Sequence, residues 1–163
     1  MSDLALIRTN SDNIDFIELV ALLDKDLAVR DGDEHAFYAQ FNKVDAIKQV
    51  VVAFRNNIPV GCGAIKAFSE TVVEVKRMFV HSENRKQGIA VKILAELEAW
   101  AAELGFSACV LETGKKQPEA IALYKKVSYR ITPNYGQYVG VDNSVCMSKS
   151  LTTRDSQISI PLA

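Results

Sequence analysis

The stretch Arg85-Lys86-Gln87-Gly88-Ile89-Ala90 places two cations and a glycine directly before an apolar helical pattern. The first backbone N–H groups of a helix have no partner within it, and the macrodipole adds about half a positive charge there. Gly88 would let an anion approach the backbone, and Arg85 and Lys86 supply full charges. The pattern favours a pyrophosphate site, although a solvated basic turn before a helix fits the same residues. The chain contains neither GxxxxGKS/T nor GxGxxG, which excludes these two nucleotide-binding loops.

Tyr124 lies in the stretch Pro118–Lys126. Proline suits the first position of a helix, so the stretch predicts a helix over about 118–127. A phenol held beside a leaving group can act as a general acid. The residues alone favour a simpler role, in which Tyr124 packs this helix onto a sheet.

Glu74 lies in a β-type run over about 71–80. Side chains alternate between the two faces of a strand. We therefore expect Glu74 on the same face as Lys76, Met78 and Val80. A carboxylate there could serve as a base or could simply pair with Lys76.

Three cysteines, each in an apolar run, indicate the redox compartment: Cys62, Cys109 and Cys146. An odd number of widely spaced cysteines in apolar surroundings predicts buried free thiols in a reducing cytosol. The alternative is a catalytic cysteine partnered by His35 or His81. Neither histidine lies in a local signature of that chemistry.

The elements that must position these residues follow from hydrophobic periodicity. The predicted order is β-α-α-β-β-β-α-β-α-β-β, in a mixed, mostly antiparallel sheet of about seven strands with helices on both faces. The strand–helix–strand unit of the second half implies a right-handed crossover. The predicted fold class is therefore α/β (α+β). The expected strands cover about 4–8, 49–54, 60–68, 71–80, 106–112, 129–131 and 145–149, and the helices 14–29, 34–42, 88–104 and 118–127.

Composition narrows the class of protein. The chain has 163 residues, 48% of them apolar and 24% charged. This fits one domain over 1–163, with 152–163 as a polar C-terminal tail. No apolar run approaches a membrane span, and the N-terminus has no secretory pattern, so we expect a cytoplasmic protein without membrane contact.

Charge is unevenly divided along the chain. The net charge of −1 argues against a nucleic-acid partner. Residues 1–50 hold ten acids and five bases, whereas the remainder holds ten acids and fourteen bases. The basic part contains the expected pyrophosphate site, and the acidic part would suit a cationic ligand.

With this context, Arg85, Gly88 and Ala90 resemble the acyl-CoA-binding motif Q/R-x-x-G-x-G/A of the GNAT N-acetyltransferases. The resemblance covers about 4–151, because the element order also agrees. It implies that pantetheine pairs with the end of the strand before the motif. Backbone N–H groups of the motif would bind the pyrophosphate. The implied cofactor-binding residues are Met78, Phe79, Val80, Arg85, Lys86, Gln87, Gly88, Ile89, Ala90, Val91 and Tyr124.

The resemblance also implies a reaction, in which an acetyl group moves directly from acetyl-CoA to an amine in a ternary complex. Tyr124 would protonate the departing thiolate. Glu74, eleven residues before Arg85, would be the base, with Glu112 or a water as rivals. The family usually has glycine before the aromatic of the next strand, whereas this chain has Val127-Ser128-Tyr129.

The sequence does not identify the molecule that accepts the acetyl group. The resemblance implies an amine on a small molecule or a peptide, no metal, and a chain that could form a homodimer. The loop Tyr135-Gly136-Gln137-Tyr138, together with Phe37, Tyr38 and Phe41, could shape the acceptor pocket. Two other functions share these features: a non-catalytic CoA-binding sensor or interaction module, and a cysteine-dependent acyltransferase.

Overall fold

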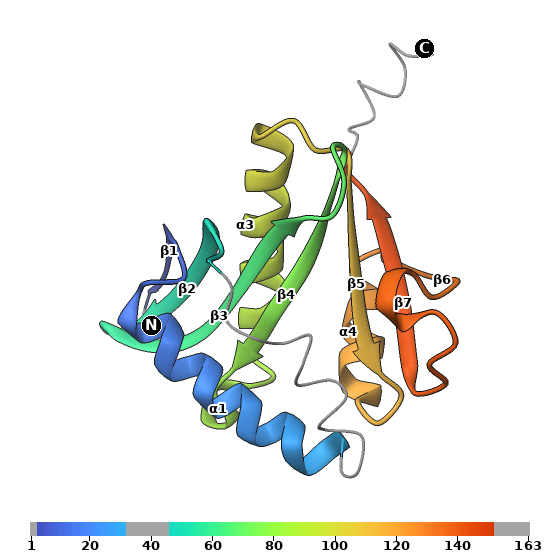
Figure 1. The fold of residues 1–163 in the computed structure, drawn as a ribbon. Helices are drawn as coiled ribbons and strands as arrows, with labels where there is room; N and C mark the ends of the chain where they lie inside the picture. Colours follow the sequence, from blue (N-terminus) through green and yellow to red (C-terminus); the bar gives the residue numbers. More distant parts are fainter. Residues whose placement is uncertain (1–2, 32–45, 152–163) are drawn as a thin grey trace.

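The computed structural model describes residues 3–31 and 46–151 (Figure 1). The expected helix over 34–42, with Phe37, Tyr38 and Phe41, and the tail over 152–163 lie outside the described residues. The helices are α1 (Ile14–Asp31), α3 (Ile89–Glu103) and α4 (Pro118–Lys126), with short 3₁₀ turns η2 (Ser82–Asn84) and η3 (Gly136–Tyr138). The strands are β1 (Leu4–Thr9), β2 (Gln49–Arg55), β3 (Ile58–Ala67), β4 (Val72–Val80), β5 (Ala108–Gly114), β6 (Arg130–Thr132) and β7 (Ser144–Ser150).

The seven strands form one mixed sheet, as predicted, and their spatial order is β1-β2-β3-β4-β5-β7-β6. All neighbours are antiparallel except β4 and β5. This parallel pair is joined only over Val72–Glu74 and Ala108–Val110. Beyond it the two strands diverge toward their C-terminal ends, as Figure 1 shows. The divergence leaves one side of the second half of β4 without a strand neighbour.

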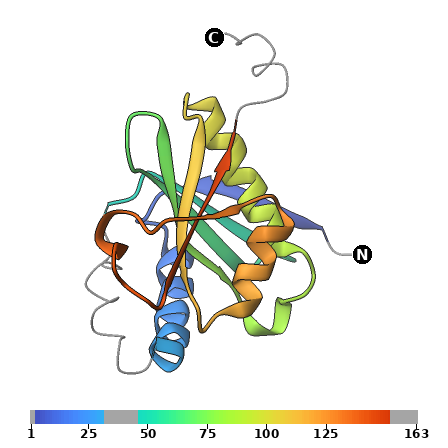
Figure 2. The same cartoon turned by 90° about the vertical axis from the view of Figure 1, so that its right-hand side faces the viewer.

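Helices α1, α3 and α4 cover both faces of the sheet, because its central strands are apolar on both sides. In β2, Val50 and Val52 pack toward α1, whereas Val51 and Ala53 pack toward α3. The α3 face also carries α4, as Figure 2 shows. Each face therefore buries its own hydrophobic core. Within the described ranges, no helix is both long and apolar enough to cross a membrane.

A bulge interrupts β4 and corrects one expectation. The β3–β4 register shifts between Cys62 and Ala64, and Arg77 takes a positive φ of 60°. One extra residue on a strand reverses the facing of everything after it. Met78 and Val80 consequently pack into the α3-side core, opposite to the expected placement on the face of Glu74. The residue pattern of β4 does not predict the bulge.

The opposing strand accommodates the bulge through a glycine. A Cβ atom added to Gly63 would lie 2.5 Å from the sulfur of Met78 and 2.9 Å from Cδ1 of Leu97. A side chain at position 63 would therefore force Met78 and Leu97 to shift within the core. Gly63 in this way allows Met78 to reach the α3 face of the sheet.

Two turns carry the backbone geometry that glycine usually supplies. Asn56 and Asn57 have φ values of 54° and 66°, so the β2–β3 turn is tighter than expected and β3 starts at Ile58 rather than Val60. Ser128, where the resembling family has glycine, takes a φ of 83°. The turn after α4 thus keeps a left-handed residue despite the substitution of serine for glycine.

Candidate functional site

A cavity of ≈ 490 Å³, here the outer cavity, lies between the end of β4, the start of α3 and α4. All the predicted cofactor-binding residues line it except Gln87. The side chain of Gln87 instead accepts a hydrogen bond from the guanidinium of Arg55. The predicted residues that line the outer cavity are Met78, Phe79, Val80, Arg85, Lys86, Gly88, Ile89, Ala90, Val91 and Tyr124.

The N-terminus of α3 borders the outer cavity with unsatisfied backbone groups. Gly88 is the N-cap, with φ 81°, and no side chain caps this end. The first hydrogen bond within the helix is donated by the N–H of Lys92 to the carbonyl of Gly88. The N–H groups of Ile89, Ala90 and Val91 thus have no partner in the helix. Such an end attracts anions, which agrees with the local sequence pattern.

Arg85 fixes the loop between β4 and α3. Its Nε donates to the carbonyl oxygen of Val80 at 2.8 Å, and its guanidinium lies 5.5 Å from the ring centre of Phe79. The same guanidinium lies 3.4 Å from the carboxylate of Asp26 in α1. Arg85 therefore positions the loop while also adding positive charge beside the helix end.

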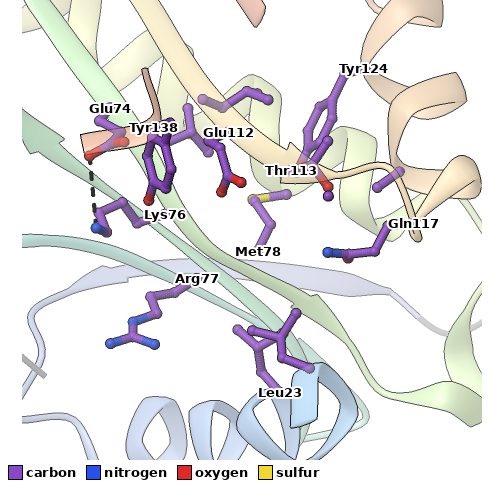
Figure 3. Close-up of a pocket in the computed structure, with 15 residues that line it drawn as sticks. Leu23, Glu74, Lys76, Arg77, Met78, Glu112, Thr113, Gln117, Tyr124 and Tyr138 are labelled. Atoms are coloured by element: carbon purple, nitrogen blue, oxygen red, sulfur yellow. Dashed lines mark ion pairs between the residues drawn. The ribbon is translucent and has the colours of Figure 1, made fainter. Parts of the chain in front are cut away.

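A second cavity of ≈ 150 Å³, here the inner cavity (Figure 3), shares lining residues with the outer one. It lies between β4, β5, α4, η3 and the side chains of α1. Tyr124 lines both cavities and is the buried residue of α4, with 8% of its surface exposed. Burial and the charge of Glu112 raise the pKa of Tyr124 to about 12. The residues common to both cavities are Leu23, Met78, Gln117, Ala120 and Tyr124.

Two carboxylates line the inner cavity. Glu74 accepts a hydrogen bond of 2.7 Å from the phenol of Tyr135 and lies 3.8 Å from Nζ of Lys76. Glu112 accepts one of 2.7 Å from the hydroxyl of Ser144. Both rival base residues therefore face the same space, and each is oriented by a hydroxyl group.

Tyr138 stands between these two carboxylates. Burial and the charges of Glu112 and Glu74 raise its pKa. Its ring also contacts Tyr135 edge to face, with ring centres 5.8 Å apart. The predicted acceptor loop consequently forms a wall of the inner cavity through Tyr138.

Sequence reasoning missed three polar residues of the inner cavity. Arg77 enters it because the bulge turns it toward α1, where the guanidinium lies 3.5 Å from Asp24. Thr113 lies near the end of β5, which extends past the expected strand end. Gln117 is the N-cap of α4 and could have been found from Pro118, which marks the first helical position.

The cysteines lie elsewhere. Cys62, Cys109 and Cys146 are free and buried, and none lines either cavity. Burial raises the pKa of Cys62 to about 12 and that of Cys109 to about 11. Thiols that stay protonated are poor nucleophiles, so the cysteine-dependent alternative loses its support. In the part of the chain that the structure describes, no group of three or more His, Cys, Asp or Glu side chains could hold a metal ion.

Comparisons with known proteins agree with this arrangement. The model of the acetyltransferase (GNAT) family matches residues 16–129. An IAA acetyltransferase of Azospirillum brasilense is 40% identical over 102 residues, which cover 62% of this chain and 67% of that protein.

Solved structures share the fold over almost the whole chain. One, a Klebsiella pneumoniae protein assigned as an acyl-CoA N-acyltransferase, is 29% identical, has a TM-score of 0.76, and covers 91% of this chain and 98% of its own. A GNAT family acetyltransferase of Elizabethkingia anophelis, solved with acetyl-CoA bound, is 17% identical and has a TM-score of 0.65. The match covers 90% of this chain and 97% of the other. Since the family model covers more than half of its length, this chain belongs to the acetyltransferase (GNAT) family and is an acetyl-CoA-dependent N-acetyltransferase.

Proposed function

We propose that acetyl-CoA binds in the outer cavity, that the acceptor amine enters the inner cavity, and that the two react beside Tyr124. The observation that carries this proposal is the position of Tyr124, which lines both cavities. A group at this junction can touch the leaving thiol from one side while the amine approaches from the other. The nucleophile and the thioester would then be held together, which removes much of the entropic cost of their encounter.

The donor would be held mainly by backbone. The pyrophosphate would accept hydrogen bonds from the N–H groups of Ile89, Ala90 and Val91, beside the charges of Arg85 and Lys86. The pantetheine arm would lie along Met78 to Val80, where β4 has separated from β5. The amide groups of that arm can form hydrogen bonds to the backbone that β5 leaves unpaired.

Tyr124 would act as the general acid. Its raised pKa keeps the phenol protonated at neutral pH, so it is available as a donor. The amine nitrogen attacks the thioester carbonyl carbon, and the tetrahedral intermediate collapses by breaking the C–S bond. The leaving thiolate takes the phenolic proton, while the amine loses its proton to a base.

Glu112 is the better supported of the two carboxylate bases. Both carboxylates accept a hydrogen bond from a hydroxyl group, but the charge of Glu112 acts on the phenol of Tyr124, whereas Glu74 lies beside Lys76. Figure 3 shows Glu112 between Tyr138 and Tyr124, with Glu74 beside Lys76. We propose that Glu112 takes the amine proton, directly or through a water. Glu74 would then orient the acceptor from the far side of Tyr138.

The acceptor would be the amine of a small molecule or of a peptide. The inner cavity of ≈ 150 Å³ is large enough for an amine-bearing end rather than for a whole polymer. Its walls carry two carboxylates, Glu74 and Glu112, and two cations, Lys76 and Arg77, so an amine would meet carboxylate partners in a cavity without a net negative charge. We also propose a cytoplasmic location, since three buried free thiols suit a reducing compartment, and we keep a homodimer as an expectation.

A screen of thiol release from acetyl-CoA against pooled primary amines tests the proposal. We expect at least one pool to accelerate thiol release far above hydrolysis. A parallel calorimetric titration would measure CoA binding. Binding of CoA without thiol release in any pool would instead support the alternative of a non-catalytic CoA-binding module.

A further inference from the structure

Helix α4 holds Tyr124 at the junction of the two cavities, and its Ala120 and Leu123 pack, partly buried, against the α3-side core. It has only nine residues, and Tyr124 is its buried one. The turn that follows contains Ser128, whose φ of 83° is costly for any residue with a side chain. The position of the Tyr124 phenol must therefore depend on what fixes the chain just after this turn.

Tyr129 is the first residue after the turn, and it contacts Tyr124 in two ways. Its backbone N–H donates to the carbonyl of Tyr124 at 2.9 Å. The two rings meet edge to face, with their centres 5.8 Å apart. Tyr129 is 2% exposed, so its own place is fixed within the core. Because the two rings are in contact, a shift of the Tyr129 ring would also displace the ring of Tyr124.

The hydroxyl of Tyr129 is tied to two other elements. It donates a hydrogen bond of 2.9 Å to Glu98 of α3, and the other oxygen of Glu98 lies 2.9 Å from Nζ of Lys149 in β7. The same Nζ lies 5.7 Å from the ring centre of Tyr129. Glu98 and Lys149 are both largely covered, with 14% and 25% of their side chains exposed. A charge-assisted pair in such surroundings has a well-defined geometry.

We propose that the chain of contacts from Lys149 through Glu98 to the Tyr129 hydroxyl positions the Tyr124 phenol for proton transfer. Tyr129, Glu98 and Lys149 are then positioning residues, since none of them lines either cavity. The inference rests on the proposed role of Tyr124 as the acid. It gives a function to a buried polar network in which one phenol, one carboxylate and one ammonium group link α3, β7 and the segment after α4.

Tyr129→Phe tests the proposal, because it removes the hydroxyl and keeps the ring. We expect kcat to fall about tenfold, since a small displacement of a catalytic group is enough for such a loss. The dissociation constant of acetyl-CoA should stay within about twofold of the wild-type value. Glu96→Gln is the matched control: Glu96 lies on the same helix but pairs with Arg8, so kcat should not change.

A double-mutant cycle with Tyr124→Phe separates positioning from general stability. If the network acts through the Tyr124 hydroxyl, Tyr129→Phe should not lower kcat further once that hydroxyl is gone. An equal loss in both backgrounds, or an unchanged kcat in Tyr129→Phe alone, would overturn the positioning role. Full kcat in Tyr124→Phe would overturn the proposed acid and this inference with it, so the two failures are distinguishable.

A second pair of variants keeps the proposal testable if Tyr129→Phe does not fold. Glu98→Gln retains an oxygen that accepts from Tyr129, whereas Glu98→Leu removes it. The glutamine variant also loses the charge that pairs with Lys149, so we expect a smaller fall in kcat for it than for the leucine variant, in which kcat should fall about tenfold. Equal kcat values in the two variants would contradict a role for the hydrogen bond to Tyr129.

Discussion

The outer and inner cavities share five residues but are built in different ways. The outer cavity takes most of its lining from one continuous stretch, Met78 to Val91, and offers backbone N–H groups at a helix end. The inner cavity gathers charged and phenolic side chains from β4, β5, α4 and η3. The proposed donor side thus depends on backbone geometry, which many sequences can produce. The proposed acceptor side depends on individual side chains, so we expect selectivity for the amine to be determined there.

Glu112→Gln should separate the two cavities most clearly, because we expect it to lower kcat without changing acetyl-CoA binding. It removes a proton acceptor from the inner cavity while keeping the shape of the side chain, so kcat should fall about 100-fold. The acetyl-CoA dissociation constant should not change, because the outer cavity is intact. Steady-state kinetics and calorimetry would check both values. Glu74→Gln is the matched variant; a larger loss of kcat there than in Glu112→Gln would return the role of base to Glu74.

Ala90→Glu should act on the outer cavity alone. Ala90 lies in the first turn of α3, where a carboxylate would repel phosphates but remain compatible with the helix dipole. We expect acetyl-CoA to bind about tenfold more weakly, by calorimetry. Because Ala90 packs partly buried against the α3-side core, thermal stability is measured in parallel. Ala95→Glu, at an exposed position of the same helix, is the control. Equal weakening by both substitutions would show that general charge, rather than the helix end, governs binding.

Ser128→Gly should have the smallest effect. Glycine adopts a positive φ without penalty, so this change should raise the free energy of unfolding by about 1 kcal/mol or less. Chemical denaturation would measure it, and kcat should stay within about twofold of wild type. Ser128→Ala retains a Cβ atom and should leave stability almost unchanged. A gain for alanine as large as that for glycine would mean that the serine hydroxyl, not φ, carries the cost.

The same contrast explains what could be predicted from the sequence. The anion-binding part of the outer cavity could be predicted from local features: a basic turn, Gly88 and the apolar period of one helix. Its β4 residues and Tyr124 were expected only from the resemblance to the GNAT family. The seven strands and the described helices followed from periodicity in the same way. The inner cavity could not be predicted in this way, because it is formed by segments that are far apart in the sequence. Ser144 donates to Glu112 and Tyr135 donates to Glu74, and neither pair is close in the chain.

The bulge shows a second limit of sequence reasoning. Strand alternation placed Met78 on the face of Glu74, but the positive φ of Arg77 reverses it. A bulge depends on the fit between two strands, here on the space at Gly63, and a single-strand pattern does not contain that information. The predicted residues other than Gln87 therefore line one cavity, but the expected facing of Met78 and Val80 was wrong.

The most direct measurement is the effect of Tyr124→Phe on kcat and, separately, on the acetyl-CoA dissociation constant. The substitution keeps the ring that packs against Tyr129 and removes only the proposed proton donor. If Tyr124 protonates the leaving thiolate where the two cavities meet, kcat should fall about 100-fold while acetyl-CoA binds as tightly as before. A kcat within about twofold of wild type would contradict this account.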